Sequence, residues 1–211
     1  GGARVLRSAA EPARTEQTII RLVIPHSFMR ILGVDPGTII TGYGVIDNID
    51  GKLALVDYGI IRMKPVWSMP LRLREIYTQL EQVIEATAPD EFAIESAFYS
   101  KNVQSTLKLG HARGVSILAA VLRQIPTSEY APREVKQAVT GTGRASKEQV
   151  EYMVMSMLGL TEKQTFLDAT DALAVAICHA GRLAPGRARA TKKRTWKDFI
   201  AENPERVASR R

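Results

Sequence analysis

Three consecutive strands are predicted within residues 30–62, with no helix between them. Residues 30–35 form a short apolar run that ends at Pro36-Gly37, a dipeptide typical of turns. Residues 42–49 alternate in character, and Asp50-Gly51 joins them to residues 52–62. An Asp-Gly pair between two such runs is the strongest short signal of a β-hairpin. The folded part of the chain must therefore be built on a sheet.

Helices and strands alternate after this meander. Apolar residues at near-helical spacing predict a helix over residues 70–86 that ends before Pro89, and a second apolar strand follows at 91–95. A loop at 96–101 leads to a long helix at 102–124, a short strand at 127–130 and a helix at 132–139. Ser146 and Gln149 predict a capping box for a helix that ends at 158, and Thr165 is expected to begin the last helix, to about 180. This order predicts an α/β domain with a mixed β-sheet flanked by α-helices.

The length of 211 residues favours one domain with tails. Residues 1–28 precede Met29 and have no helical or strand period, so they are expected to be a disordered N-terminal extension. Residues 29–181 are the predicted folded domain. The single cysteine, Cys178, excludes a disulfide framework and a Cys-rich zinc site, and fits a reducing compartment. No segment runs for about 18 apolar residues without a charge, so no membrane span is expected.

The net charge of +7 is unevenly distributed. Residues 182–211 form a basic C-terminal tail, with ten Lys and Arg against three Asp and Glu. Within the domain, no acid lies between Glu95 and Glu129. A second acid-free stretch lies between Val135 and Lys147. These two basic stretches indicate either a surface that faces phosphates or a solvated helix face. The candidate DNA-binding cations are Lys101, Lys108, Arg113, Lys136, Arg144 and Lys147.

Four carboxylates are the candidate catalytic and metal-binding residues. Asp35 and Glu95 each end an apolar strand, and Asp168 and Asp171 lie on one face of the last predicted helix. If the two strands are neighbours, all four acids can meet at one sheet edge. Such a cluster repels itself unless cations bind, and oxygen ligands suit Mg²⁺ or Mn²⁺. Two such ions about 4 Å apart can activate a water and stabilise the leaving oxygen in phosphodiester cleavage.

Each acid also has a structural explanation by itself. Asp35 could be a turn residue and Glu95 a solvated rim residue. Asp168 could complete a capping box with Thr165, and Asp171 could favour the helix dipole. Their joint occurrence on one predicted sheet favours the metal site.

Other chemistry is less well supported by the sequence. His111 and His179 are isolated along the chain, and Cys178 is most simply a buried small residue. Gly141-Thr-Gly143 lacks the spacing of a dinucleotide or P-loop fingerprint.

Five motifs within residues 29–181 resemble the RuvC family of Holliday junction resolvases: residues 31–37 (ILGVDPG), 41–44 (TGYG), 92–95 (FAIE), 108–114 (KLGHARG) and 168–174 (DATDALA). The resemblance implies a ribonuclease H-like nuclease domain that uses Mg²⁺ as cofactor, with two ions per subunit and Mn²⁺ able to substitute. It implies a homodimer that nicks two symmetry-related strands of four-way junction DNA during recombination and repair. The family's metal-binding acids fall on Asp35, Glu95, Asp168 and Asp171.

The same resemblance implies further roles and partners. Phe98 matches the family's aromatic residue in the loop after the strand-end Glu, and Lys136 and Lys147 match basic residues that approach the DNA. The RuvA and RuvB branch-migration proteins are the implied partners, and the cytoplasm is the implied location. An aromatic beside Lys101 could stack on an opened base step, although Phe98 could also be a core residue.

The long helix at 102–124 leaves two possibilities open. Leu107, Gly114, Leu118 and Val121 lie on neighbouring turns, with small residues nearby that allow close helix approach. They could form a dimer seam or pack on the sheet.

Two other classes of protein share parts of the pattern. The Asp35-Pro36-Gly37 turn resembles the first phosphate loop of actin-like and sugar-kinase ATPases, but those require a second matching domain. A non-catalytic module that binds branched DNA would use the basic stretch, but would have no reason to gather four acids near phosphates.

Overall fold

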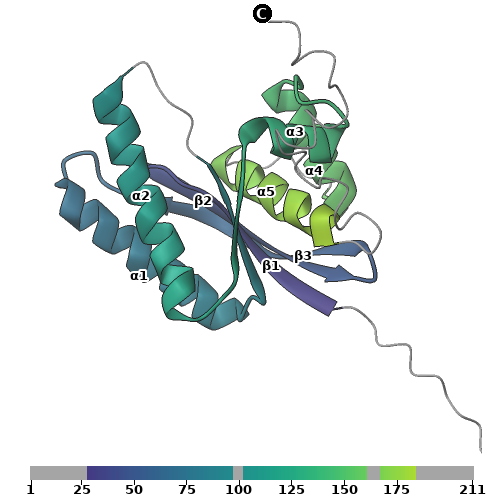
Figure 1. Cartoon of the computed structure of the whole chain (residues 1–211), viewed down its shortest axis with the longest axis horizontal. Coiled ribbons are helices and arrows are strands. Elements are labelled where there is room, and N and C mark those ends of the chain that lie inside the picture. The colour runs from purple at the N-terminus through teal and green to yellow at the C-terminus, as the bar shows by residue number, and fades with distance from the viewer. Residues whose placement is uncertain (1–27, 97–101, 161–166, 184–211) are drawn as a thin grey trace, which may run out of the picture.

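A five-stranded mixed sheet forms the centre of the molecule (Figure 1). The structure is a computed structural model that describes residues 28–96, 102–160 and 167–183. The strands lie in the order β3-β2-β1-β4-β5. Their bounds are β1 Phe28–Asp35, β2 Ile40–Ile49, β3 Lys52–Arg62, β4 Glu91–Glu95 and β5 Thr127–Tyr130.

The sheet is antiparallel on one side and parallel on the other. β1 pairs antiparallel with β2, and β2 with β3, whereas β1 pairs parallel with β4, and β4 with β5. Asp50 and Gly51 both have positive φ, at 52° and 85°. Two positive φ values in succession are what a two-residue hairpin turn requires, so the predicted hairpin is confirmed.

Helices cover both faces of the sheet (Figure 1). Helices α1 (Met69–Thr87) and α2 (Val103–Leu122) pack against each other on one face. On the other face lie α3 (Pro132–Thr140), α4 (Lys147–Leu158) and α5 (Leu167–Leu183). α5 contacts β1, β2 and β4, while α3 and α4 pack on α5. Among the described helices, none is both long enough and apolar enough to span a membrane.

The predicted boundaries hold with small differences. β3, β4 and β5 begin and end at the predicted residues, and the capping box of α4 is present, with Ser146 Oγ accepting from Gln149 N. β1 already begins at Phe28, which the sequence placed in the extension. α5 continues to Leu183, beyond the predicted end near residue 180. Thr165, the predicted first residue of that helix, lies outside the described residues.

Helix α5 lies unusually close to the sheet because glycines remove side chains beneath it. A Cβ on Gly33 would be 2.2 Å from Ala172 O, and one on Gly44 would be 2.6 Å from Leu173 Cδ2. Any larger residue at these positions would push the helix away. Most of the helix is buried as a result: eleven of its seventeen residues belong to the buried class. This close packing fixes the position of the acids at the start of α5 relative to the strands.

Candidate active site

Asp35 and Glu95 lie at the same edge of the sheet, as the sequence predicted. β1 and β4 run parallel with Val34 paired to Ile94, and each acid is the next residue on its strand. Gly33, two residues before Asp35, contacts α5, and Ala93, two residues before Glu95, belongs to the core on the α5 side. Because side chains alternate along a strand, both carboxylates are on the face that α5 covers.

The turn that follows Asp35 is held by a reciprocal pair of hydrogen bonds. Thr41 Oγ1 donates to Gly37 O at 2.8 Å and accepts from Gly37 N at 3.2 Å. A Cβ on Gly37 would be only 1.9 Å from Ile40 O, so the tight path of this turn requires glycine. The turn thereby fixes the end of β1 that carries the carboxylate.

The first turn of α5 brings Asp168 and Asp171 to the same place. Asp35 is paired with Gly42 of β2, and the Cβ position of Gly42 lies 1.9 Å from Asp168 O. The backbone of Asp168 therefore rests directly on β2, beside the residue that pairs with Asp35. Asp171 follows three residues later, on the same side of the helix.

The pKa values of the strand acids record this proximity. Burial, followed by the negative charges of Glu95, Asp171 and Asp168 in that order, raises the pKa of Asp35 to about 8, against the lowering effect of Lys147. Burial likewise raises the pKa of Glu95 to about 7, with Asp171 as the next cause. Carboxylates that resist ionisation in this way are stabilised when a cation neutralises them. The structure thus brings all four predicted acids into one electrostatic cluster.

Two lysines oppose this negative charge. Lys147 Nζ donates to Asp171 Oδ2 at 3.1 Å, and this contact, followed by the charges of Asp35 and Asp168, raises the pKa of Lys147 against the effect of burial. Lys136 lowers the pKa of Glu95 through its charge, while its Nζ donates to Ala145 O at 2.6 Å. Two of the predicted DNA-binding cations therefore lie at the acidic cluster.

The chemistry of the donors fits a hard divalent cation, although the side chains do not enclose one as they stand. Four carboxylates offer oxygen ligands only, the set that Mg²⁺ and Mn²⁺ prefer. Within residues 28–96, 102–160 and 167–183, no group of three or more His, Cys, Asp or Glu side chains is arranged so that it could hold a metal ion. The ammonium of Lys147 instead supplies a positive charge within the cluster.

The other predicted DNA-binding residues lie in different surroundings. Phe98 and Lys101 fall outside the described residues. Lys108 is exposed on α2. Arg113, also on α2, forms an ion pair with Glu129 of β5, so its guanidinium is already engaged within the chain. Arg144 lines a cavity with Lys136.

Arg133 and His179 have contacts in the structure that the sequence did not predict. Arg133 was not recognised because Glu134 follows it and interrupts the acid-free stretch, yet it lines the same cavity as Lys136 and Arg144. His179 is isolated in sequence but not in space: its Nδ1 lies 2.7 Å from Tyr130 Oη, and its Nε2 lies 3.4 Å from Glu91 Oε2. No local pattern could indicate these contacts, because they join residues far apart along the chain.

The exposed face of α2 bears on the choice between a dimer seam and packing on the sheet. Leu107, Leu118 and Val121 have exposed fractions of 60%, 47% and 51%. The buried residues of α2 are instead Ala112, Ser116, Ala119 and Ala120. A Cβ on Gly114 would have nothing within 4 Å. Within the described part of the monomer, this row of residues does not pack on the sheet.

Comparisons with known proteins give matches over most of the chain. The family model of the crossover junction endodeoxyribonuclease RuvC matches residues 31–179. The chain is 49% identical over 180 residues to RuvC of Bacteroides fragilis, covering 84% of this chain and 95% of that protein. It is 52% identical over 152 residues to RuvC of Geobacter sulfurreducens, covering 72% and 92%.

Solved structures support the same fold. Thermus thermophilus RuvC in complex with a Holliday junction substrate superposes with a TM-score of 0.71 at 32% identity, covering 76% of this chain and 98% of that one. The yeast mitochondrial Holliday junction resolvase Ydc2 has a TM-score of 0.53 at 14% identity, covering 72% of this chain and 78% of its own. At that identity the second likeness concerns the fold alone. The ribonuclease H-like prediction for the sheet and its helices is confirmed.

Proposed function

This chain belongs to the RuvC family of crossover junction endodeoxyribonucleases, and we propose that it resolves four-way DNA junctions with the acidic cluster at the edge of its sheet. The reaction is the hydrolysis of one phosphodiester bond in each of two symmetry-related strands, during recombination and repair. The observation that carries the assignment is the convergence of the acids: Asp35 and Glu95 are partly buried at the ends of neighbouring strands, and each has its pKa raised by other members of the cluster. Membership of a nuclease family decides against the ATPase and the non-catalytic binding module.

Asp35, Glu95, Asp168 and Asp171 are the residues that would hold divalent cations. We assign Mg²⁺ as the cofactor, two ions per subunit, with Mn²⁺ as a substitute. Bound there, the ions would activate a water and stabilise the leaving oxygen. The raised pKa values support this assignment, because partly buried carboxylates that repel one another gain stability from a cation among them.

The chain's own residues prepare the site for a phosphate. Partial burial on the α5 face reduces the contact of Asp35 with bulk water, which strengthens electrostatic interactions there. Lys147 keeps a positive charge beside Asp171 and is placed to bind a phosphate oxygen when the DNA enters. Lys136 adds a second positive charge on the side of Glu95. Together these lysines offset the repulsion between the acids and the DNA backbone.

We propose that the active form is a homodimer that associates through the exposed face of α2. Val103, Leu107, Leu118, Val121 and Leu122 are large apolar residues exposed on this one helix. Two symmetric active sites would account for paired nicks, since a two-fold axis matches the symmetry of the junction. By family resemblance, RuvA and RuvB are the proposed partners and the cytoplasm is the proposed location.

The test is a cleavage assay on a four-way junction and on a linear duplex of the same sequence. We expect nicking of the junction in Mg²⁺ or Mn²⁺, none in excess EDTA, and little cleavage of the duplex. Glu95→Gln removes one charge and one metal ligand, so we expect single-turnover nicking to fall by about 10³-fold or more while junction binding in EDTA is kept. Full nicking in EDTA would refute the metal assignment.

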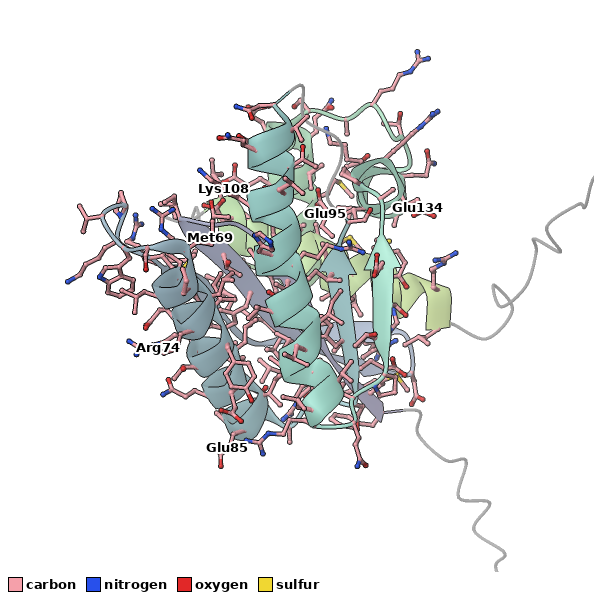
Figure 2. All side chains as sticks on the ribbon, turned by 60° about the vertical axis from the view of Figure 1, so that its left-hand side comes forward. Met69, Arg74, Glu85, Glu95, Lys108 and Glu134 are labelled. Carbon is pink, nitrogen blue, oxygen red and sulfur yellow. The ribbon has the colours of Figure 1, made fainter. Side chains whose placement is uncertain are left out.

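Glu85→Gln is the matched control for this variant. Glu85 is an exposed residue at the end of α1 that lies far from Glu95, as Figure 2 shows. The same chemical change at Glu85 should leave nicking unchanged. Equal losses in both variants would mean that the effect comes from net charge, and Glu95 would then have no special part in the reaction.

A further inference from the structure

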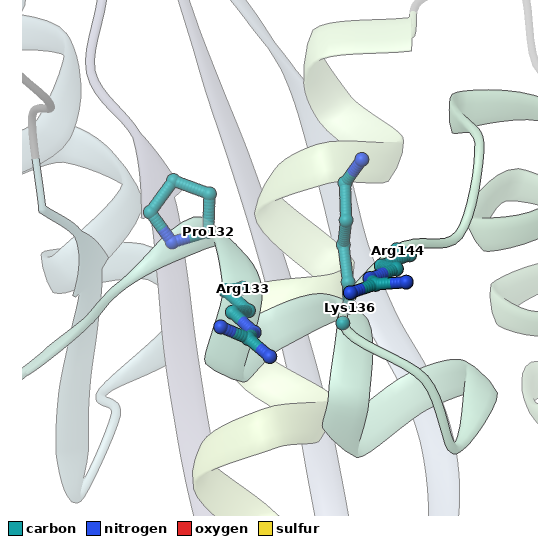
Figure 3. A pocket seen from close by; sticks show the side chains of 5 residues that line it. Pro132, Arg133, Lys136 and Arg144 are labelled. Carbon is teal, nitrogen blue, oxygen red and sulfur yellow. The ribbon is translucent and has the colours of Figure 1, made fainter.

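A basic cavity lies between the start of α3 and the loop that leads to α4. It measures about 370 Å³ and is lined by Pro132, Arg133, Lys136, Gly143 and Arg144 (Figure 3). Three of these five residues carry a positive charge. In the described part of the chain, no carboxylate forms an ion pair with any of the three. Like charges gathered in this way repel one another unless an anion lies between them.

The nearby acid does not neutralise the cavity. Glu134 follows Arg133 in sequence, but its Oε2 accepts a hydrogen bond from Ala131 N at 3.0 Å. This contact engages the carboxylate at the N-terminus of α3, where the helix dipole favours negative charge. The carboxylate of Glu134 therefore stabilises the start of the helix and forms no ion pair with the cations of the cavity.

Two of the three cationic side chains of the cavity contact the chain around them. Lys136 Nζ donates to Ala145 O at 2.6 Å, which fixes the ammonium against the loop. Arg133 lies across Gly143, where a Cβ would be 2.5 Å from Arg133 Cγ and 3.0 Å from its Nε. Because Gly143 has no side chain, the Arg133 side chain can pass directly over it. A cation positioned before binding, as Lys136 is, loses less entropy when an anion arrives.

The cavity adjoins the acidic cluster through the end of β5. Glu95 is paired with Tyr130 at that end, and α3 begins two residues later at Pro132, which lines the cavity. An anion held by Arg133 and Arg144 would thus lie beside the place where the scissile phosphate meets the carboxylates. Arginine suits this role because its planar guanidinium can give two parallel hydrogen bonds to phosphate oxygens.

We propose that this cavity is a phosphate subsite, in which Arg133 and Arg144 hold a phosphodiester of the substrate DNA next to the one that is cut. The inference rests on the proposed function, because it takes DNA as the ligand. It assigns Arg133 a role that its sequence context hides, and it gives Gly143 the role of shaping the subsite. The subsite positions the backbone without reading bases.

The first experiment measures junction binding in EDTA over a series of salt concentrations. The variants are Arg133→Gln, Arg144→Gln and the double variant, with Arg74→Gln as the matched control. Arg74 is an exposed arginine on α1 (Figure 2). Each substitution in the cavity should lower affinity by roughly tenfold and reduce the slope of log affinity against log salt by about one. Arg74→Gln should do neither, and cavity variants that behave like it would overturn the proposal.

The second experiment places one uncharged methylphosphonate linkage at successive positions near the cut site. At one position the neutral linkage should weaken binding of the wild-type protein by roughly tenfold but leave the double variant unaffected, because the same contact is already absent. If every linkage has the same effect in both proteins, the arginines act only through long-range charge and there is no subsite.

Gly143→Ala tests the geometry without removing a charge. The new Cβ should displace Arg133, so the variant should lose the response to the neutral linkage as Arg133→Gln does. Added to Arg133→Ala, which has no Cγ to displace, the same change should have a smaller effect, because only Arg133 O, 3.2 Å from the new Cβ, remains close. A Gly143→Ala protein that binds as well as the wild type would show that the path of Arg133 is irrelevant.

These binding measurements separate this proposal from the proposed function. Wild-type protein that binds the junction at the subsite but does not nick it in Mg²⁺ would refute the nuclease assignment alone. Wild-type protein that nicks normally, with cavity variants that bind equally well, would refute the subsite alone.

Discussion

The two faces of the sheet are covered by helices in different ways. α5 has eleven of its seventeen residues buried and lies against the glycine backbone of β1 and β2. α2 has only four buried residues among twenty, all of them small, and leaves large apolar side chains exposed. On the α5 face, close packing fixes the helix relative to the strands. The α2 face instead has an apolar surface that the described residues of the monomer do not cover.

This difference assigns separate tasks to the two faces. A catalytic cluster needs groups placed to within a fraction of an ångström, so the acids lie where a helix backbone rests on a strand backbone. An association surface needs accessible apolar area instead. The following predictions test that division, beginning with the largest expected effect.

Gly42→Ala should damage the site through the close packing of α5. The added Cβ would be 1.9 Å from Asp168 O, so the first turn of the helix must move away from β2. We expect single-turnover nicking to fall by about 10²-fold or more and the free energy of unfolding to fall by about 1–3 kcal/mol. Cleavage kinetics and denaturant unfolding would measure the two effects.

Gly181→Ala is the control on the same helix, since a Cβ there would have nothing within 4 Å. This change should leave nicking unchanged and should stabilise the helix by up to about 1 kcal/mol. Full nicking by Gly42→Ala would mean that the placement of Asp168 does not depend on this contact.

Leu118→Glu should break association at the α2 face. Leu118 is 47% exposed, so the monomer should fold normally, while a dimer would bury an unpaired charge. We expect the dimer dissociation constant to rise by about 10²-fold or more, measured by sedimentation velocity, and paired nicking to fall with it. Ile49→Glu, at an exposed apolar position at the far end of β2, should have neither effect. A Leu118→Glu protein that remains dimeric would contradict the seam.

The stability of the metal-free protein should fall as pH rises from about 4 to about 8. The folded-state pKa values of Asp35 and Glu95 are raised to about 8 and about 7, so the folded state keeps protons that the unfolded state has lost. In saturating Mg²⁺ the trend should reverse, because the metal binds the ionised acids. The melting temperature should change by a few degrees, since 1 kcal/mol corresponds to about 2–4 °C at this chain length.

Asp35→Asn is the control for this pH effect. It should flatten both curves, because it removes the group with the highest carboxylate pKa in the cluster. Parallel curves with and without Mg²⁺ in the wild type would contradict metal binding at these acids.

The opposite end of α5 should show a smaller effect of opposite sign. Burial lowers the pKa of His179 to about 4, so the unfolded state takes up a proton first as pH falls below about 6.5. Stability from this residue is therefore present at neutral pH and is lost between about pH 6.5 and pH 4. The difference in melting temperature between wild type and His179→Gln should shrink over that range. A constant difference would mean that His179 does not titrate with unfolding.

Local signals determined most of the secondary structure. The Asp50-Gly51 turn, the strand at Glu91–Glu95 and the capping box at Ser146 all follow from residues within a few positions of one another. The four acids could also be proposed from the sequence, because two end apolar strands and two share one face at a helix start, so that one sheet edge can bring all four together. Their assignment as metal ligands followed from that joint placement and is also implied by the resemblance, and it stays a prediction.

Tertiary structure decided which of these residues meet. Gly42 allows Asp168 to rest beside Asp35, Arg113 is engaged by Glu129, and Arg133 lies over Gly143 beside Lys136. Each of these contacts joins separate elements, so no periodicity or motif contains it. The sequence sets the chemistry of each position, but distances between elements depend on how helices and strands pack, and pKa values and cavities follow those distances.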